Sequence, residues 1–172
     1  MTSKKIFITG IAGAGKSTVA GELAQRGVVA IDIDHIPGLC GWVHNETGER
    51  VVVDNPDNDF MDHHEYKCDM ESLKKMMDQA NGNVAVFGCV GDNSDFLPLF
   101  GTSLLLQCSP STTIHRLQTR STNPFGTDEG VQKRILEWKE VFDEMMIQAG
   151  AVVIDAEQPL EQVTDDIMKH FN

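Results

Sequence analysis

The stretch "GIAGAGKST", Gly10 to Thr18, follows a short apolar run and precedes a helical pattern. Glycine loses more backbone freedom on folding than any other residue and packs no side chain, so a glycine-rich junction is costly. From Gly10 to Gly15, Lys16 and Ser17 the spacing satisfies G-x-x-x-x-G-K-[ST]. In that motif bare backbone lets consecutive N–H groups surround a phosphate at the positive end of a helix. The stretch therefore predicts a nucleotide-binding loop.

The side chains of this loop suggest how a nucleotide would be held. Lys16 is expected to reach the outer phosphates, and the Ser17 hydroxyl is expected to ligate Mg²⁺. The predicted cofactors are therefore ATP and Mg²⁺. The residues expected to contact the phosphates are Gly10, Ala12, Gly13, Ala14, Gly15, Lys16, Ser17 and Thr18.

Length and composition limit the function further. At 172 residues the chain is predicted to form one domain, residues 1–172. Its net charge of −12 argues against a nucleic-acid partner, because the phosphates would be repelled. No apolar run approaches the roughly 20 residues that span a bilayer, and the N-terminus is no signal peptide. We expect a cytoplasmic protein with no membrane partner, either a monomer or a dimer.

The distribution of the cysteines is also typical of a cytoplasmic protein. They are widely scattered and form no CxxC pair, which favours reduced thiols over a disulfide framework or a zinc site. Cys89 and Cys108 are expected to be small core residues. The full set is Cys40, Cys68, Cys89 and Cys108.

Short apolar, partly β-branched runs alternate with helical patterns along the chain. This alternation predicts an α/β fold with a parallel sheet wrapped by helices. The predicted strands are Lys5–Thr9, Val28–Ile33, Asn83–Phe87, Ser103–Cys108 and Ala151–Ile154. Helical stripes at three-and-four spacing, among them Ile135, Trp138, Phe142 and Met145, are interpreted as core-facing.

Two stretches interrupt the alternation. Residues 35–64 are polar, rich in Asp, Asn and Gly, and show no clear periodicity. Residues 119–130 (TRSTNPFGTDEG) break an otherwise helical region. Loops of this length in a compact domain are usually lids or binding segments, with plain disordered surface as the alternative.

Two carboxylates follow the second predicted strand in "AIDID". Asp32 and Asp34 would lie at the carboxyl end of the sheet, where ligands of such folds collect. Alternation along a strand would point both to the same side. One could hold Mg²⁺ through water and the other could accept a proton from an attacking hydroxyl; a capping or turn role is the alternative.

Two arginines stand one helical turn apart in "HRLQTRSTNPFG". Arg116 and Arg120 are predicted to face one direction, as residues i and i+4 do. Guanidiniums in that position would stabilise charge on a transferring phosphoryl group while the following segment closes over it. Solvated helix charges are the alternative.

Together these motifs resemble the small P-loop kinases of the nucleoside monophosphate kinase and shikimate kinase-like superfamily. The likeness spans nearly the whole chain: GIAGAGKS, the D-x-D, the R-x-x-x-R and the final "VVIDAEQPLEQV". It implies a three-layer α/β/α fold with a five-stranded parallel sheet in the order 2-3-1-4-5. By the same resemblance residues 35–64 are an acceptor-binding insertion, and residues 119–130 are a lid.

The resemblance also implies roles for single residues. Lys16, Asp34, Arg116 and Arg120 would be catalytic, while Ser17 and Asp32 would serve the metal. The adenine would lie near Asp155, Gln158 and Pro159, with Arg116 stacked on its other face.

The chain departs from the family pattern in two places. Gly88 follows the third strand where adenylate kinase-like members carry an aspartate, which is closer to shikimate and gluconate kinases. Arg50 is the one arginine between His35 and Tyr66, among seven acidic residues. An anionic acceptor would be poorly stabilised there, so a neutral or cationic small-molecule alcohol is the more plausible partner.

Other polar residues keep two interpretations. His44, His63 and His64 could bind a metal, although surface or helix-capping roles are favoured. Asp92 and Asn93 could contact the acceptor or cap a helix over residues 94–100.

Three functions remain: an ATP-dependent kinase of a small-molecule hydroxyl, a nucleoside or nucleotide kinase, and a P-loop ATPase or switch without an acceptor. No N-K-x-D motif of a GTPase and no apolar run ending in D-E of an AAA-type motor is present.

Overall fold

The computed structural model describes residues 3–90, 96–121 and 123–172. Its centre is a five-stranded sheet in the order β2-β6-β1-β7-β8, in which every neighbouring pair is parallel. Counted among themselves along the chain, these strands have the order 2-3-1-4-5, which confirms the predicted fold class. The strands are β1 (Lys5–Thr9), β2 (Val29–Asp32), β6 (Val84–Phe87), β7 (Thr102–Gln107) and β8 (Val152–Asp155).

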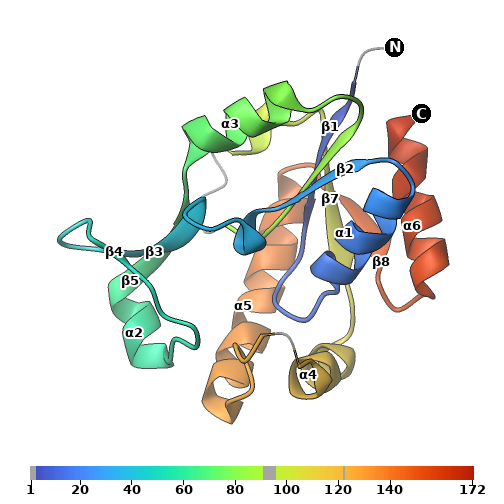
Figure 1. Cartoon of the computed structure of the whole chain (residues 1–172). Coiled ribbons are helices and arrows are strands. Elements are labelled where there is room, and N and C mark those ends of the chain that lie inside the picture. Colours follow the sequence, from blue (N-terminus) through green and yellow to red (C-terminus); the bar gives the residue numbers. More distant parts are fainter. Residues whose placement is uncertain (1–2, 91–95, 122) are drawn as a thin grey trace.

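Helices cover both faces of this sheet and complete three layers (Figure 1). On one face lie α1 (Lys16–Gln25) and α6 (Leu160–Met168), which the short 3-10 helix η3 (Lys169–Phe171) extends. On the other face lie α3 (Met70–Gln79) and α5 (Glu129–Gln148). The remaining long helix, α4 (Pro110–Thr119), lies at the carboxyl end of the strands.

The central strands are apolar on both faces because helices bury both. In β1, Ile6 and Ile8 pack against the α1 and α6 layer, whereas Phe7 packs on the opposite side. All three side chains are no more than 1% exposed. Strands buried on both faces are continuous apolar runs, which is why these strands could be predicted from the sequence.

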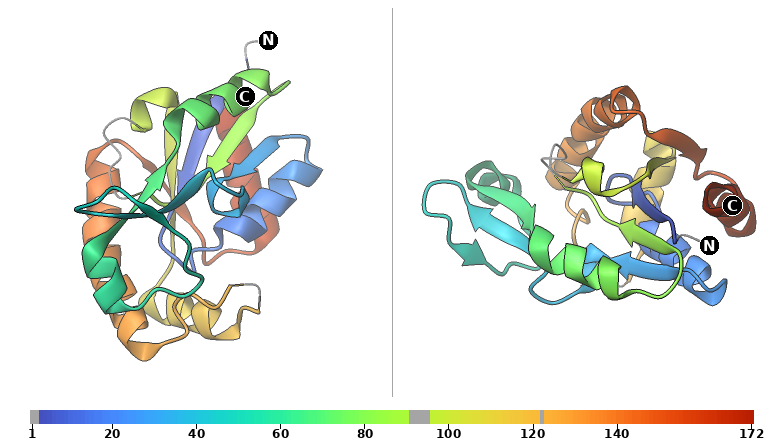
Figure 2. Two further views of the ribbon diagram at one scale, coloured as in Figure 1. Left: turned by 60° about the vertical axis from the view of Figure 1, so that its left-hand side comes forward. Right: turned by 90° about the horizontal axis from the view of Figure 1, so that it is seen from above.

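The segment predicted to be irregular, residues 35–64, is instead largely ordered, and that prediction was wrong. It contains β3 (Cys40–His44), β4 (Arg50–Val51) and α2 (Asn58–His63), and β5 (His64–Cys68) follows directly. The strands form an antiparallel sheet in the order β4-β3-β5, here called the small sheet. The small sheet and α2 project to one side of the body (Figure 2).

The physical reason for this error is partial burial. Every residue of β3 is half-buried, so the strand shows no buried apolar run. Its stability comes from cross-strand pairs with β5, such as Trp42 with Tyr66, whose ring centroids are 5.3 Å apart. Such partners are distant in sequence, and single-strand periodicity does not reveal them.

Two 3-10 turns complete the fold, η1 (Ile33–His35) and η2 (Leu97–Leu99). The described part of the helix predicted over residues 94–100 is only the single turn η2. Asp92 and Asn93 lie outside the described residues. In the described ranges, no helix has the length and apolar character needed to cross a membrane.

Candidate active site

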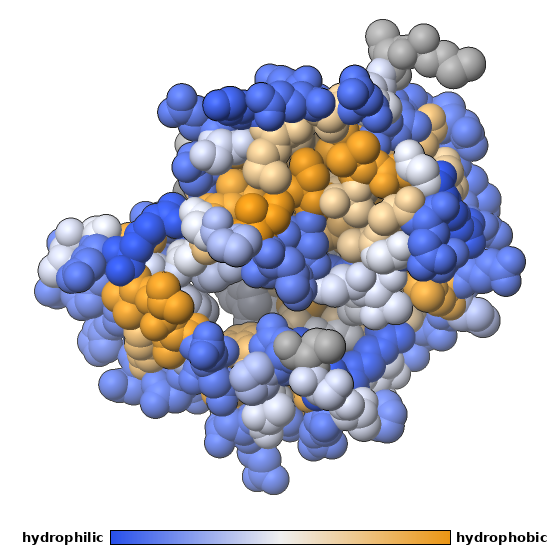
Figure 3. All heavy atoms as spheres, in the orientation of Figure 1, coloured by the Kyte–Doolittle hydropathy of each residue, from blue (hydrophilic) through white to orange (hydrophobic). Residues whose placement is uncertain are grey.

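A cleft of about 1170 Å³ opens at the carboxyl end of the central sheet. The P-loop forms its floor, the small sheet and α2 form one wall, and α5 with the segment before it forms another. Figure 3 shows the molecule hollowed between the projecting small sheet and the body. Ligands of open α/β sheets bind at this edge, so this cleft is the candidate active site.

The P-loop geometry explains the glycines. Gly15 has φ of 99° and precedes α1, which begins at Lys16. A Cβ on Gly10 would lie 2.8 Å from both the Leu106 carbonyl oxygen and the Ala14 Cβ, so no side chain fits there. The Lys16 ammonium donates to the Gly10 carbonyl at 2.6 Å, which keeps the lysine folded over the loop. The loop is thus a backbone cradle of the kind that accepts phosphate.

Ser17, Asp32 and His35 form a polar cluster beside the cradle. The Ser17 hydroxyl donates to Asp32 Oδ2 at 2.8 Å, and His35 Nδ1 lies 3.0 Å from the same oxygen. A hydroxyl and a carboxylate are hard oxygen ligands of the kind Mg²⁺ prefers. The residues present therefore fit a Mg²⁺ ion that is shared with nucleotide phosphates.

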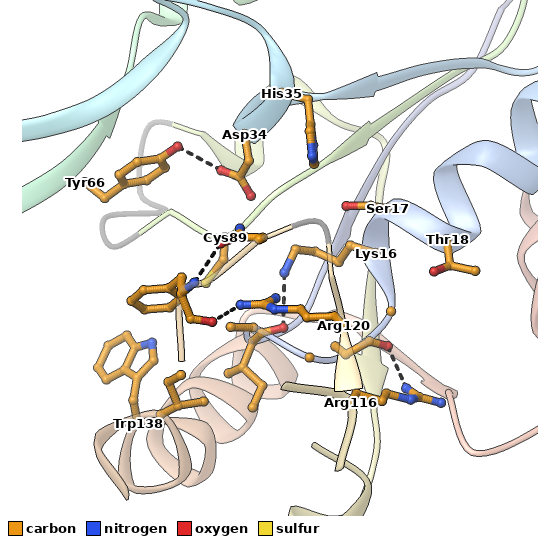
Figure 4. A pocket seen from close by; sticks show the side chains of 18 of the residues that line it. Lys16, Ser17, Thr18, Asp34, His35, Tyr66, Cys89, Arg116, Arg120 and Trp138 are labelled. Atoms are coloured by element: carbon orange, nitrogen blue, oxygen red, sulfur yellow. Dashed lines mark hydrogen bonds between the residues drawn. The ribbon is translucent and has the colours of Figure 1, made fainter. Parts of the chain in front are cut away.

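Asp32 and Asp34 do not share a strand face, contrary to the prediction. β2 ends at Asp32, and Asp34 lies in η1, where its N–H donates to Asp32 Oδ1 at 3.2 Å. Both carboxylates still meet the P-loop side: Asp32 contacts Ser17, while Asp34 lines the cleft (Figure 4). The 3-10 turn, not strand alternation, produces this arrangement.

Burial and neighbouring groups act in opposite directions on the pKa of Asp34. Its side chain is open to the solvent in the cleft, but the surrounding walls desolvate it and raise the pKa of its carboxyl. The charge of Lys16 and a hydrogen bond from the Tyr66 hydroxyl, 3.0 Å from Oδ1, oppose that rise in pKa. Asp34 is thus a carboxylate whose basicity the site has increased.

Arg116 and Arg120 do not point in the same direction, so the prediction that they share one helix face was wrong. Arg116 ends up against the P-loop, donating to the carbonyl oxygens of Ala14 at 3.2 Å and Ala156 at 2.8 Å. Arg120 follows the last residue of α4 with an extended backbone, and its guanidinium points toward the centre of the cleft (Figure 4). Because α4 stops at Thr119, the i, i+4 relationship of a helix does not apply.

The Arg120 guanidinium is only partly satisfied. Nη2 donates to the Phe125 carbonyl oxygen, whereas the buried Nε has no hydrogen-bond partner among the residues that the structure describes. Burial lowers the pKa of Arg120. A buried donor without an acceptor is unfavourable, so this group is suited to an anion arriving in the cleft.

The loop between β8 and α6 reaches the cleft through fewer residues than expected. Of the predicted set, Gln158 lines the cleft, whereas Asp155 and Pro159 do not. Asp155 accepts from the Glu157 N–H at 2.9 Å and organises the turn, and Pro159 precedes α6. Ala156 lines the cleft beside Gln158 and accepts the hydrogen bond from Arg116.

Sequence reasoning missed most of the aromatic lining. From the small sheet, Trp42 and Tyr66 face the cleft, and Trp138 faces it from α5. Trp138 was interpreted as core, but it is 41% exposed, so that interpretation was wrong. Nothing in the α5 stripe distinguishes Trp138 from Phe142, which is buried. Further lining residues are Met61, His64, Glu65, Cys89, Phe125, Arg134 and Ile135.

The cysteine predictions were half right. Cys108 is buried, as expected, whereas Cys89 is half-buried and lines the cleft.

The histidines were expected to have surface or capping roles; His63 is exposed, whereas His44 and His64 are half-buried, and none of the three caps α3. His63 ends α2, and Asp69 caps α3. His64 stacks on Phe60 with centroids 3.8 Å apart and meets His44 across the small sheet. Within residues 3–90, 96–121 and 123–172, no three His, Cys, Asp or Glu side chains are grouped to hold a metal.

The structure also explains the glycine that departs from the adenylate kinase pattern. A Cβ on Gly88 would lie 2.2 Å from Ile33 Cδ1, inside van der Waals contact. Ile33 is fully buried under the turn that positions Asp34. A side chain at position 88 would therefore displace η1, which carries the candidate acceptor-side carboxylate.

The family follows from the same features. Residues 6–137, which contain the P-loop, the small sheet and most of the cleft lining, match the family model described as AAA domain. The chain belongs to the AAA domain family. No curated protein matches its sequence significantly.

Solved structures extend the fold comparison for this AAA domain. Shikimate kinase from Acinetobacter baumannii in complex with shikimate has a TM-score of 0.60 and 18% identity, covering 98% of this chain and 91% of that one. Deoxyadenosine kinase from M. mycoides with bound dATP has a TM-score of 0.59 and 17% identity, covering 96% and 98%. A gluconokinase from Sinorhizobium meliloti 1021 has a TM-score of 0.55 and 18% identity, covering 98% and 91%. The predicted resemblance to small P-loop kinases is confirmed in the fold.

Proposed function

We propose that this AAA domain is an ATP-dependent phosphotransferase that moves the γ-phosphate of ATP to a hydroxyl of a small molecule. One observation carries the proposal. Lys16 over the P-loop and Asp34 under the small sheet line the same cleft from different sides. The cleft therefore has a cradle for phosphate and, on the side of the small sheet, a region lined by Trp42, Asp54, Glu65 and Tyr66, here called the second chamber. A protein that only binds or hydrolyses a nucleotide has no need for that chamber.

The nucleotide half is supported by the cradle. We propose that the loop from Gly10 to Thr18 wraps the phosphates and that Lys16 leaves the Gly10 carbonyl to reach the outer ones. Ser17 and Asp32 would hold Mg²⁺, which neutralises charge on the phosphates when it is bound. Arg116 and Gln158 would border the adenine, because the Arg116 guanidinium joins the P-loop to the loop before α6.

The acceptor half is supported by Asp34. Its raised pKa makes it a better proton acceptor than an ordinary aspartate, while Lys16 and the hydrogen bond from Tyr66 favour its ionised form. We propose that Asp34 orients the acceptor hydroxyl and takes its proton as the phosphoryl group transfers. Because that transition state is loose, orientation contributes at least as much as basicity.

Arg120 and the segment that follows it supply the remaining charge. The predicted lid, residues 119–130, overlaps the last residue of α4 and the first two of α5; between these helices the described residues, 120–121 and 123–128, form no helix, as a lid would. We propose that the unpartnered Arg120 Nε turns to the transferring phosphoryl oxygens when this lid closes.

The acceptor's charge is inferred from the lining of the second chamber. Asp34, Asp54 and Glu65 line the cleft on that side. The arginine there, Arg134 from α5, is already neutralised by Asp62 at 2.6 Å. Arg50 does not line the cleft and donates to the Gly38 carbonyl oxygen instead. A neutral or cationic alcohol therefore suits this chamber better than a phosphorylated or carboxylated one.

A second candidate is a nucleoside kinase, and the aromatic lining favours it. Trp42, Tyr66 and Trp138 all face the cleft, and flat rings stack well on a planar base. A nucleoside is also a neutral alcohol, so the electrostatic argument does not exclude it.

The deciding experiment measures phosphoryl transfer from ATP over a panel of amino alcohols, sugars, nucleosides and nucleoside monophosphates, with ATP hydrolysis measured in parallel. Transfer to an alcohol or nucleoside above hydrolysis supports the proposal. In the Asp34→Asn variant, transfer should fall by about a hundredfold with ATP affinity nearly unchanged. Hydrolysis without transfer to any member, equal in the variant, would instead support the ATPase or switch function.

Cellular context forms part of the proposal. We propose that the protein acts in the cytoplasm without a nucleic-acid partner, because its net charge is −12 and its four cysteines are free.

Asp32→Asn should raise the Mg²⁺ concentration needed for half-maximal transfer while leaving nucleotide binding without metal unchanged.

A further inference from the structure

Cys40 and Cys68 lie directly opposite each other in the small sheet. Cys40 is the first residue of β3, Cys68 is the last residue of β5, and the antiparallel register pairs them. The Asp69 N–H donates to the Leu39 carbonyl oxygen at 2.7 Å, one residue beyond the pair on each strand. That bond places Cys40 and Cys68 at a non-hydrogen-bonded position of the ladder, where opposing side chains are closest.

This position meets the geometry of a disulfide. Opposing Cα atoms at non-hydrogen-bonded sites are about 4.5 Å apart, and disulfides join Cα atoms roughly 4.4 to 6.8 Å apart. The two strands need no rearrangement for the sulfurs to join. The remaining cysteines have no such partner: Cys108 is buried under α4, and Cys89 follows β6 in the central sheet.

We propose that Cys40 and Cys68 form a reversible dithiol–disulfide site, a redox modification site on the small sheet that oxidised low-molecular-weight thiols such as glutathione disulfide convert to the bridged form. The inference does not depend on the proposed kinase activity. In the reducing cytosol the pair stays as thiols, as the structure has it, and bridges under oxidative load.

The two thiols differ in pKa and therefore in their roles in thiol–disulfide exchange. The pKa of Cys68 is lowered and that of Cys40 is raised, and the largest cause of both shifts is the interaction between the two thiols. The nearby Arg50 guanidinium lowers the pKa of both thiols and so favours a thiolate at this pair, against the charges of Asp69 and Asp34. Cys68 is therefore the attacking thiol and Cys40 the resolving one.

The exchange balances in two steps. The Cys68 thiolate attacks one sulfur of glutathione disulfide, forming a mixed disulfide and releasing one glutathione thiolate. Cys40 then loses its proton to solvent, and its thiolate attacks Cys68 Sγ, breaking the mixed disulfide and releasing the second glutathione. The protein gives up two electrons and two protons, and one glutathione disulfide becomes two glutathione molecules.

The bridge would act on the wall of the cleft. Trp42 is two residues from Cys40 and Tyr66 is two residues from Cys68, so all four side chains project from one face of the small sheet. A covalent bond at the end of this ladder fixes the spacing of the two strands that present Trp42 and Tyr66 to the cleft. The P-loop is not part of the bridged segment, so the nucleotide cradle is unaffected.

The test uses the native full-length chain with glutathione disulfide, followed by alkylation and tryptic mass spectrometry. Trypsin cleavage after Lys and Arg places the two cysteines of the pair on different peptides. The peptide of residues 27–50 contains Cys40, that of residues 68–74 contains Cys68, and that of residues 76–116 contains both other cysteines. We expect one linked species that joins 27–50 to 68–74, with mass two hydrogens below the sum, and its loss on adding dithiothreitol. Two of the four thiols should remain alkylatable.

Matched variants and the unfolded chain complete the design. Cys40→Ser and Cys68→Ser should each abolish the linked species, and Cys108→Ser should leave it unchanged. Cys40→Ser should accumulate the glutathione adduct on Cys68, whereas Cys68→Ser should form little adduct. In guanidinium the same oxidation should give mixed pairings, because four cysteines allow three connectivities. Four alkylatable thiols after oxidation of the native chain, or pairing with residues 76–116 as often as between the two expected peptides, would overturn the inference.

Discussion

The hydroxyl of Tyr66 donates a hydrogen bond to Oδ1 of Asp34 at 3.0 Å, joining β5 of the small sheet to the turn that follows β2 of the central sheet. The bond stabilises the ionised carboxylate and holds its second oxygen toward the cleft (Figure 4). Tyr66 is the one tyrosine of the chain, and burial together with the charge of Asp34 raises the pKa of its hydroxyl. It therefore remains a donor throughout the physiological range.

Tyr66→Phe should lower kcat and shift its pH dependence. The hydrogen bond from Tyr66 lowers the pKa of Asp34, so its removal lets burial raise that pKa further. A base works only when ionised, so the acid limb of the kcat profile should move to higher pH. Loss of a hydrogen bond to a charged group should reduce kcat near neutrality by about tenfold. Reduced stability with an unmoved acid limb would show that Tyr66 only supports the fold.

Asp34→Asn should make the protein slightly more stable at neutral pH. The pKa of Asp34 is raised in the folded state, so the native protein binds more protons than the unfolded chain between the ordinary and the raised value. Stability is therefore lost as the pH rises through that window, and the variant avoids that loss. The carboxyl is solvent-accessible and partly screened, so the gain should stay below about 1 kcal/mol.

Thermal unfolding at several pH values checks this expectation, with Glu140→Gln on the exposed face of α5 as the control for removing one negative charge. The advantage of Asp34→Asn should vanish below the ordinary aspartate pKa of about 3.9. An advantage that persists there, or that Glu140→Gln reproduces, would contradict the electrostatic explanation.

Arg120→Ala should reduce turnover much more than ATP binding. Its Nε has no partner in the described structure, so the group gains most when charge develops on the phosphoryl oxygens. Removing one such donor typically costs about a hundredfold in kcat. Arg26→Ala, which breaks surface ion pairs with Glu22 and Asp165, is the matched control and should leave turnover unchanged. Equal losses in kcat and ATP affinity would make Arg120 a ground-state anchor.

Gly10→Ala and Gly21→Ala should have opposite effects. At Gly10 a methyl group would meet the Leu106 carbonyl oxygen at 2.8 Å, so the cradle must distort, and nucleotide binding and stability should both fall. At Gly21, inside α1, the methyl group meets nothing within 4 Å, and alanine should stabilise the helix by about 0.5 to 1 kcal/mol. Chemical denaturation with nucleotide titration measures both. A neutral Gly10→Ala would mean that the loop tolerates side chains.

Intrinsic fluorescence should report binding in the cleft. The chain has two tryptophans, and both Trp42 and Trp138 line the cleft. An acceptor identified by the transfer panel should change the emission of the wild-type protein. Trp42→Phe should remove most of that change, because Trp42 stands in the small sheet beside Tyr66. A signal carried wholly by Trp138 would place the acceptor on the α5 side instead.

The sequence alone determined the central sheet, its strand order by resemblance, and the P-loop. These features depend on local information: buried strands are continuous apolar runs, and a phosphate cradle needs glycines at fixed spacing. Ser17 and Asp32 meet because the first turn of α1 lies beside the carboxyl end of β2. Asp34 lines the cleft beside the P-loop, but the 3-10 turn that places it there was not foreseen.

Tertiary structure alone decided the second half of the cleft. The strands of the small sheet are half-buried and are stabilised by partners across the sheet. The register between β3 and β5 decides that Trp42 lies opposite Tyr66 and that Cys40 lies opposite Cys68, and no local pattern in the sequence shows this. Arg116 and Arg120 have the spacing of one helix face, but α4 ends between them. The Arg116 guanidinium contacts carbonyl oxygens of two loops that are distant in sequence, whereas the Arg120 guanidinium contacts the Phe125 carbonyl oxygen in the segment that follows it. Trp138 lies on an apolar helical stripe, as a core residue would. It is exposed because this part of α5 borders the cleft, which only the tertiary structure shows. Local pattern fixes which elements form, whereas the packing between elements fixes which side chains face the cleft.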